Sequence, residues 1–236
     1  MNGILLQVQQ TVDTAANLYN QNPQTSVEVP DMNLWQMAVY GGWIMIVLAV
    51  LLAIAVYLFI ERLVVINAAK KEDKSFMDRI KDYIHEGKID SALNLCKQTN
   101  TPSAHMVEKG ISRIGRPMND VQVAIENVGN LEVANLEKNL VILATIAAGA
   151  PMLGFLGTVL GMVQTFYNMA NNASGVIELS SLSEGMYQAM VTTVGGLIVG
   201  ILVIFAYNYL VARIDSVVRL LEGRTMEFMD LLNEPA

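Results

Sequence analysis

Three long segments of the chain contain no charged side chain, and they constrain its fold more than any other feature. They run over residues 32–60, 139–177 and 185–212. In the first, the apolar core from Val39 to Ile60 has 22 residues, which would extend about 33 Å as a helix and cross a hydrocarbon layer of about 30 Å. Because a segment inside a bilayer must satisfy its backbone hydrogen bonds internally, each segment is expected to be a helix. The sequence therefore predicts an all-α integral membrane protein with three transmembrane helices.

Composition agrees with a membrane protein and narrows its chemistry. Of the 236 residues, 53% are hydrophobic and 16% are charged, a balance typical of a chain that resides in a bilayer. The net charge of −7 argues against binding to nucleic acid. The single cysteine, Cys96, excludes an intramolecular disulfide and is expected to be a buried, reduced thiol.

The basic residues predict the orientation of the spans. Twelve of the fifteen Lys and Arg residues lie between Arg62 and Lys138, and the other three follow the third span. None precedes residue 62 or lies between spans two and three. Because basic residues concentrate on the cytoplasmic side of a membrane, we expect the N-terminus outside and the C-terminus in the cytoplasm.

These patterns divide the chain into seven segments. In order, they are an outer, N-terminal amphipathic segment (1–36), transmembrane helix 1 (37–62), a helical cytoplasmic loop (63–138), transmembrane helix 2 (139–170), a short outer loop (171–185), transmembrane helix 3 (186–212) and a C-terminal cytoplasmic helix (213–236). The N-terminal pattern, which includes Ile4, Val8 and Val12, fits either a short amphipathic helix on the membrane or a frayed terminus.

The cytoplasmic loop is expected to be mostly helical. Residues 86–88 and 101–102 contain Gly and Pro and are typical of breaks between short helices. From Asp120 onward an apolar period of helical type continues, so this helix is expected to run straight into span two. A similar period continues past Arg213 and predicts that span three extends into the cytoplasm. Both extensions should pack against each other or against a neighbouring subunit.

Spans two and three carry stripes of small and polar residues. The stripe of span two consists of Ala147, Pro151, Gly154, Thr158, Gly161 and Thr165, and that of span three of Ala189, Thr193, Gly196 and Gly200, with Gln188, Thr192 and Gly195 beside it. Spacings of three and four residues place each stripe on one face of a helix. Span one is apolar all round past Trp43, so we expect it to form the outer wall around spans two and three.

Two interpretations of the stripes are open. Small residues at this spacing let helices approach closely, and a Thr hydroxyl can bond a carbonyl of its own helix. Alternatively, the hydroxyls face water, ions or a partner helix. The candidate packing residues are Gly154, Gly157, Gly161, Gly196 and Gly200.

The same segments resemble a known family. The stretch LEKNLVILATIAAGAPMLGFLGTVLGMVQTF from Leu136, the third span, GGW before span one and GKIDSALNLCKQ in the loop are similar to MotA/TolQ/ExbB proton-channel proteins. The resemblance covers about Leu34 to Arg213, and three spans with the large loop after the first match the ExbB/TolQ branch.

The resemblance implies a subunit of an ion-driven motor in the inner membrane of diderm bacteria. Such proteins form a ring, typically a homopentamer, whose pore holds a dimer of a single-span, ExbD- or TolR-like partner with an essential membrane Asp. Ion flow drives rotation, and the work reaches a TonB- or TolA-like protein. The outer segments of this chain would then be periplasmic, and membrane lipids would surround span one.

By the family's motif, Thr158 and Thr193 match the pore threonines of spans two and three. Gln188 falls where the family often has Glu, and Thr165 and Thr192 are further candidates for the ion path. A Gln cannot carry a proton, so the three charge-free segments contain no acidic or basic side chain and the titrating acid would come from the partner. H⁺ is favoured over Na⁺, although hydroxyl and carbonyl oxygens could coordinate Na⁺. A sodium-driven stator and a non-conducting scaffold are the alternatives.

Enzymatic and metal-dependent functions have little support in the sequence. His85 and His105 both lie in the cytoplasmic loop, so no Ser–His pair can form within the membrane. Together with Cys96, their spacing fits no structural zinc pattern. We therefore expect no catalytic residue, no bound metal and no cofactor.

Overall fold

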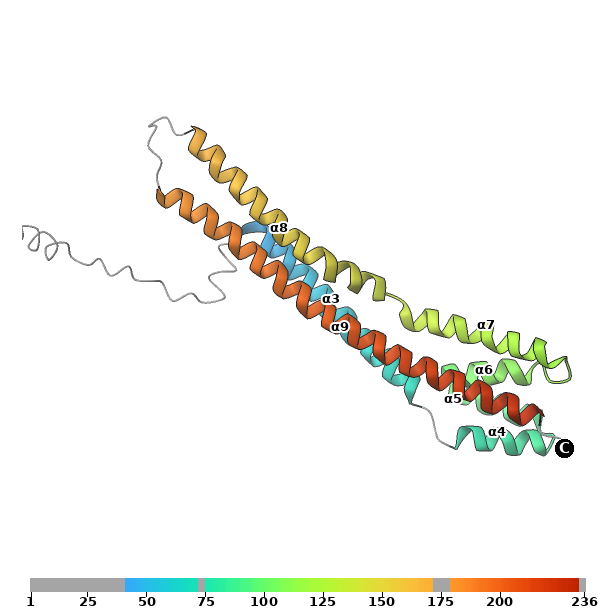
Figure 1. The fold of residues 1–236 in the computed structure, drawn as a ribbon. Coiled ribbons are helices and arrows are strands. Elements are labelled where there is room, and N and C mark those ends of the chain that lie inside the picture. The colour runs from blue at the N-terminus through green and yellow to red at the C-terminus, as the bar shows by residue number, and fades with distance from the viewer. Residues whose placement is uncertain (1–40, 72–74, 172–178, 234–236) are drawn as a thin grey trace, which may run out of the picture. The chain divides into compact units, whose positions relative to one another are not determined.

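The computed structural model describes residues 41–71, 75–171 and 179–233. These residues contain no strand, which confirms the all-α prediction for this part of the chain. The helices are α3 (Gly42–Lys70), α4 (Phe76–His85), α5 (Ile89–Thr99), α6 (Pro102–Ile111), α7 (Met118–Glu137), α8 (Leu140–Asn171) and α9 (Leu179–Asn233) (Figure 1). The predicted N-terminal segment, 1–36, and residues 172–178 of the predicted outer loop lie outside the described residues.

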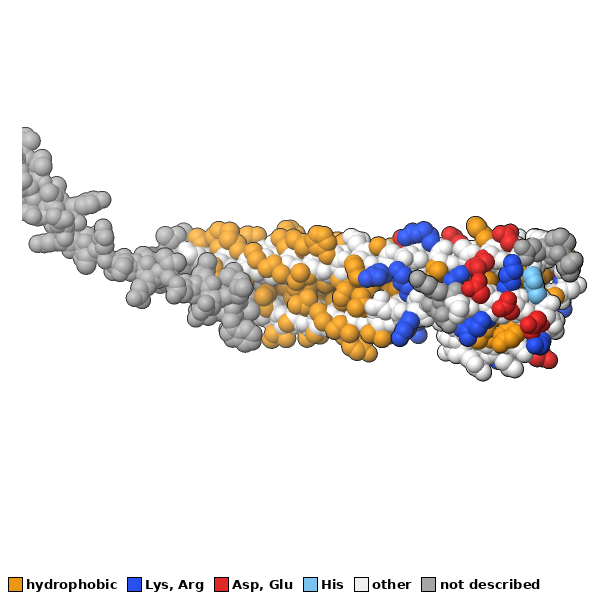
Figure 2. Space-filling model, turned by 90° about the horizontal axis from the view of Figure 1, so that it is seen from below, with side chains coloured by type: hydrophobic (Ala, Val, Ile, Leu, Met, Phe, Trp, Pro, Cys, Tyr) orange, Lys and Arg blue, Asp and Glu red, His pale blue; other side chains and the backbone are white. Residues whose placement is uncertain are grey.

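Three helical stretches of the described chain are long and apolar enough to cross a membrane. They are Gly42–Lys70, Met118–Asn171 and Leu182–Asn233. Hydrophobic side chains cover the surface over one part of these helices, whereas basic and acidic side chains gather over the other (Figure 2). This division is that of a membrane-spanning part followed by a water-exposed part.

Helix α9 continues without a break from the third span to Asn233. Its 55 residues include no proline, so no residue lacks the backbone N–H that an α-helix needs. The predicted extension of span three beyond Arg213 is therefore present as one helix (Figure 1).

The junction between α7 and α8 differs from the expected continuous helix. Helix α7 ends at Glu137 and α8 begins at Leu140, and Asn139 between them has φ 66°. Asn tolerates this left-handed conformation better than most residues, and it interrupts the helical ladder. Helix α7 and span two are thus separate helices, joined by residues 138–139.

The end of α7 is capped from another helix. Arg62 of α3 is only 5% exposed, and its Nη1 donates to the Asn135 carbonyl oxygen at 3.1 Å. Its Nη2 pairs with Glu61 Oε1 at 2.8 Å. A cation at a helix C-terminus is favoured by the helix dipole, so Arg62 fixes α3 to the junction between α7 and α8.

The short helices α4 and α6 and the longer α7 pack against α9 in its C-terminal half (Figure 1). The predicted breaks at 86–88 and 101–102 separate α4 from α5 and α5 from α6. At the first, Gly87 has φ +72°. At the second, Asn100 has φ 45° and the Thr101 hydroxyl accepts the backbone N–H of Ala104 at 3.4 Å, which caps α6.

The core of this region contains Cys96. Its side chain is 0% exposed, which confirms the prediction of a buried thiol. Burial, with a smaller contribution from the Glu108 charge, raises the pKa of the Cys96 thiol to about 12. The thiol is therefore protonated at neutral pH and poorly nucleophilic.

We expect Cys96 to resist alkylation in the folded protein. At pH 8, N-ethylmaleimide should label less than about a tenth of the protein in an hour and nearly all of it after denaturation in SDS. Mass spectrometry of the intact chain measures the labelled fraction. Rapid labelling of the folded chain would contradict the buried placement.

Candidate functional site

Helices α8 and α9 form the most extensive helix contact of the described chain, and α3 packs against both. Their small-residue stripes meet at Gly154 and Gly196. A Cβ added at Gly154 would lie 2.9 Å from the Thr192 carbonyl oxygen and 3.0 Å from the Gly196 Cα. One added at Gly196 would lie 2.7 Å from the Ala150 carbonyl oxygen. The two backbones are therefore in direct contact, and neither position has room for a side chain.

The other predicted packing glycines also lie in this contact. A Cβ at Gly200 would meet Pro151, one at Gly161 would meet Ala189, and one at Gly157 would meet Thr192. Within a single chain, the stripe of span two is thus covered mainly by span three. The surfaces of α8 and α9 that remain open are largely apolar, with Met152, Phe155 and Met190 exposed.

Two threonine hydroxyls converge on one carbonyl oxygen at this contact. Thr193 Oγ1 donates to the Gly154 carbonyl oxygen at 3.1 Å. Thr192 Oγ1 donates to the Ala189 carbonyl oxygen at 2.7 Å and lies 3.4 Å from that of Gly154. Thr192 is 2% exposed, whereas Thr193 is half-buried. Thr192 therefore lies in the buried interior of the α8–α9 contact, and Thr193 lies at its more open side.

The remaining predicted threonines of span two bond their own helix. Thr158 Oγ1 donates to the Phe155 carbonyl oxygen at 2.6 Å and Thr165 Oγ1 to that of Gly161 at 2.8 Å. Thr165 is buried against Gly185 of α9, while Thr158 is half-buried. The structure thus brings Thr192 and Thr193 together at Gly154 and places Thr158 one helical turn farther along α8.

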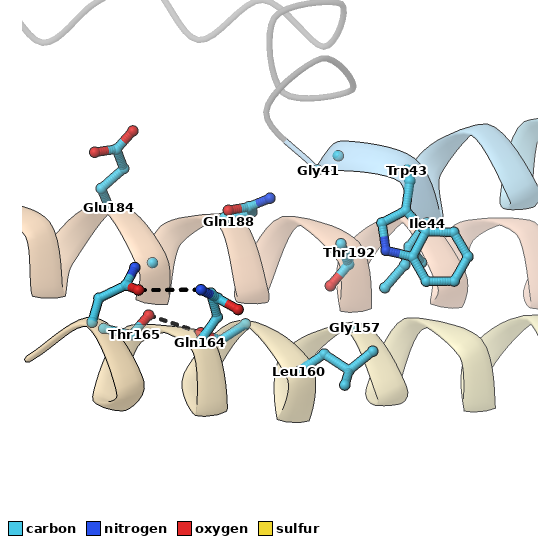
Figure 3. Close-up of a pocket in the computed structure, with 14 residues that line it drawn as sticks. Gly41, Trp43, Ile44, Gly157, Leu160, Gln164, Thr165, Glu184, Gln188 and Thr192 are labelled. Atoms are coloured by element: carbon cyan, nitrogen blue, oxygen red, sulfur yellow. Dashed lines mark hydrogen bonds between the residues drawn. The ribbon is translucent and has the colours of Figure 1, made fainter. Parts of the chain in front are cut away.

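A polar cavity of about 370 Å³ lies beside this contact, near the end of α8 and the start of α9 (Figure 3). It includes three of the predicted path residues, Thr165, Gln188 and Thr192, but neither Thr158 nor Thr193. Its lining residues are Gly41, Gly42, Trp43 and Ile44 of the α3 end, Gly157, Leu160, Gly161, Gln164, Thr165 and Asn168 of α8, and Glu184, Gly185, Gln188 and Thr192 of α9.

Glu184 of the cavity is absent from the sequence-based set of candidates. The third span was expected to begin at residue 186, but α9 begins at Leu179 and therefore carries Glu184 one turn before Gln188. Glu184 therefore lies outside the predicted third span, 186–212, but on the same helix. The spacing of four residues between Glu184 and Gln188 could have indicated that both lie on one face of the same helix.

Comparison with known proteins identifies the family. Residues 98–223 match the MotA/TolQ/ExbB proton channel family. This chain belongs to that family. An ExbB homolog of Methanothermobacter thermautotrophicus is 31% identical over 180 residues, which are 75% of this chain and 62% of that protein.

Two further relatives place the chain in the ExbB/TolQ branch of the family. The biopolymer transport protein ExbB of Aquifex aeolicus is 40% identical over 79 residues, 34% of this chain and 52% of that protein. The Tol-Pal system protein TolQ of Haemophilus influenzae is 29% identical over 140 residues, 59% of this chain and 56% of that protein. The chain thus spans between half and two thirds of the length of each of these relatives.

The family match covers every predicted path residue and most of the cavity wall. All of the lining residues from α8 and α9 fall within residues 98–223, while those of α3 lie outside. With its three apolar helices, this member of the ExbB/TolQ branch is a multi-pass membrane protein.

The polar side chains of the water-exposed part bond one another. His105 Nδ1 lies 2.8 Å from Glu132 Oε1, and its Nε2 lies 3.0 Å from Asn100 Oδ1. Among the residues described, no three His, Cys, Asp or Glu side chains are placed to hold a metal ion.

Proposed function

We propose that the chain is an ExbB-like stator subunit of an ion-driven motor in the bacterial inner membrane. Spans two and three conduct ions under the proton motive force, and the motor energises biopolymer transport or other Ton- or Tol-type work at the outer membrane. The names of the ExbB and TolQ relatives support this class of function. The N-terminus is periplasmic and the C-terminus cytoplasmic, in agreement with the distribution of Lys and Arg.

The junction of Thr192, Thr193 and the Gly154 carbonyl carries this proposal. It places two neighbouring hydroxyl groups on one carbonyl oxygen inside a helix contact made mainly of small residues, where they can hydrogen-bond water or coordinate a cation. The half-buried Thr193 is the member that a partner helix or water can reach.

The motor requires partners that supply what this chain lacks. The chain forms a homo-oligomer, a pentamer by resemblance, around a dimer of an ExbD- or TolR-like protein whose membrane Asp titrates beside Thr158 and Thr193. A TonB- or TolA-like protein receives the work. The electrical component of the driving force is about 2.3 kcal/mol per charge per 100 mV. H⁺ is the proposed ion, and Na⁺ the alternative.

Removal of the Thr193 hydroxyl tests the ion path. In the full complex in liposomes, we expect Thr193→Val to reduce H⁺ flux about tenfold, since a hydrogen bond of about 1.4 kcal/mol is lost. Thr193→Ser should keep most of the flux. Thr145→Val is a matched control, because the Thr145 hydroxyl bonds only the Val141 carbonyl oxygen of its own helix.

Unchanged flux in Thr193→Val would contradict the proposed path. The alternative function, a non-conducting scaffold, is favoured by the mutual covering of the two stripes within one chain and by the uncharged Gln188. A wild-type complex that passes neither H⁺ nor Na⁺ under any gradient would establish the scaffold.

A further inference from the structure

We propose that the cavity beside the α8–α9 contact is a cation-binding vestibule, with the Glu184 carboxylate as its charged ligand. The ligand is a monovalent cation, either Na⁺ or hydronium. The inference rests on the proposed function, because it assigns the place at which the transported ion first binds. It concerns a residue outside the sequence-derived path and one helical turn from Gln188.

The first argument is the absence of a counter-ion for Glu184. Among the cavity-lining residues, it is the only one with a charged side chain. No basic side chain of the described residues pairs with it. In addition, the sequence has no Lys, Arg or His before Arg62 or between Lys138 and Arg213. Residues 1–61 and 139–212 therefore contain acidic side chains but no basic one. A carboxylate at a polar cavity without a basic neighbour attracts a mobile cation.

The second argument is the polar row that leads inward from Glu184. Glu184, Gln188 and Thr192 line the cavity at spacings of four residues and therefore follow one face of α9. From the first to the third, the helix rises by about 12 Å. In Figure 3 the Glu184 side chain extends from α9 on the side away from α8, so the carboxylate lies at the rim and Thr192 lies deeper. The inner end of the row is the hydroxyl that adjoins Gly154.

The third argument is the volume and the polar lining of the cavity. Gly42 lines the cavity beside Gln188, and a Cβ added there would lie 3.0 Å from the Gln188 amide nitrogen. On the opposite wall, Gln164 Nε2 donates to Asn168 Oδ1 at 3.1 Å. The volume of about 370 Å³ accommodates several waters, at roughly 30 Å³ each in the liquid. Amide, hydroxyl and carboxylate oxygens are the ligands that hard cations prefer.

Trp43 allows binding to be measured without any ion flux. It lines the same cavity and is the only tryptophan left in a Trp35→Phe background. The full chain in nanodiscs is titrated in two arms at constant ionic strength. One arm exchanges N-methylglucamine for Na⁺ at fixed pH, and the other varies pH without Na⁺. We expect a saturable change in Trp43 fluorescence in one arm, which identifies the cation.

Glu184→Gln should raise the half-saturating concentration of that cation at least tenfold, while Glu222→Gln, a control on the cytoplasmic part of α9, leaves it unchanged. Flux through the wild-type complex is measured in parallel. A cation response that depends on Glu184 without any flux would refute the motor and retain the site. Fluorescence that responds in neither arm, or equally in Glu184→Gln, would overturn the vestibule whatever the flux.

Discussion

Replacement of Gly196 by Ala should weaken the α8–α9 contact more than any other single methyl group added to these helices. The new Cβ would lie 2.7 Å from the Ala150 carbonyl oxygen and 2.8 Å from the Gly154 Cα. Both neighbours are backbone atoms, which cannot move aside as a flexible side chain can. The helices must separate, and overpacking of this kind costs about 3 kcal/mol.

Gly149→Ala provides the matched control for this prediction. It makes the same chemical change on α8, but nothing lies within 4 Å of the added Cβ. Because Ala is favoured over Gly within a helix by about 1 kcal/mol, this variant should be at least as stable as the wild type. The thermal unfolding midpoint in mild detergent measures both variants. A midpoint for Gly196→Ala equal to that of Gly149→Ala would show that the two backbones are not in contact.

Replacement of Arg62 by Ala should loosen the junction between α7 and α8. The guanidinium is almost fully buried and bonds the Asn135 carbonyl oxygen, so its removal leaves that carbonyl unpaired. A hydrogen bond from a charged group contributes about 1.5–3 kcal/mol, and we expect a loss of about 2 kcal/mol. Arg62→Lys should recover part of this loss, since an ammonium can replace one bond of the guanidinium fork.

Hydrogen exchange distinguishes this local effect from general destabilisation. In Arg62→Ala, the amides at residues 134–139 should exchange faster relative to those of α9. Glu61→Gln is the control, because it leaves the bond to the Asn135 carbonyl intact and its amide oxygen can still accept from the Arg62 guanidinium. If residues 134–139 were protected equally in the wild type and in Arg62→Ala, the capping role would be wrong.

The helices of the fold could be predicted from the sequence because bilayer physics leaves few alternatives. Charge-free segments of this length give three apolar helices, and the apolar period past Arg213 gives the extension of α9. The break before Leu140 could not be predicted in this way. An apolar period continues across Asn139, and only the φ of 66° shows that the residue leaves the helix.

The candidate site was less accessible to sequence reasoning. Spacing showed that the stripe through Gly154 needs a close neighbour, but it could not show that Gly196 of the same chain is that neighbour. Glu184 was missed for a different reason. A charge-free segment marks only the apolar part of a transmembrane helix, and here it begins after Glu184. Backbone hydrogen bonding extends α9 outward to Leu179, so the helix includes Glu184.

Helix α9 also has a mechanical consequence. Its 55 residues make a rod of about 80 Å, and a tilt of about 5° at one end displaces the other by about 7 Å. Helices α7 and α8, which both pack against α9, are instead two separate helices joined at residues 138–139, where Arg62 bonds the end of α7. Because α9 is continuous and the α7–α8 pair is jointed, we expect a tilt of α9 about Gly154 to appear as sliding between α7 and α9 at the far end.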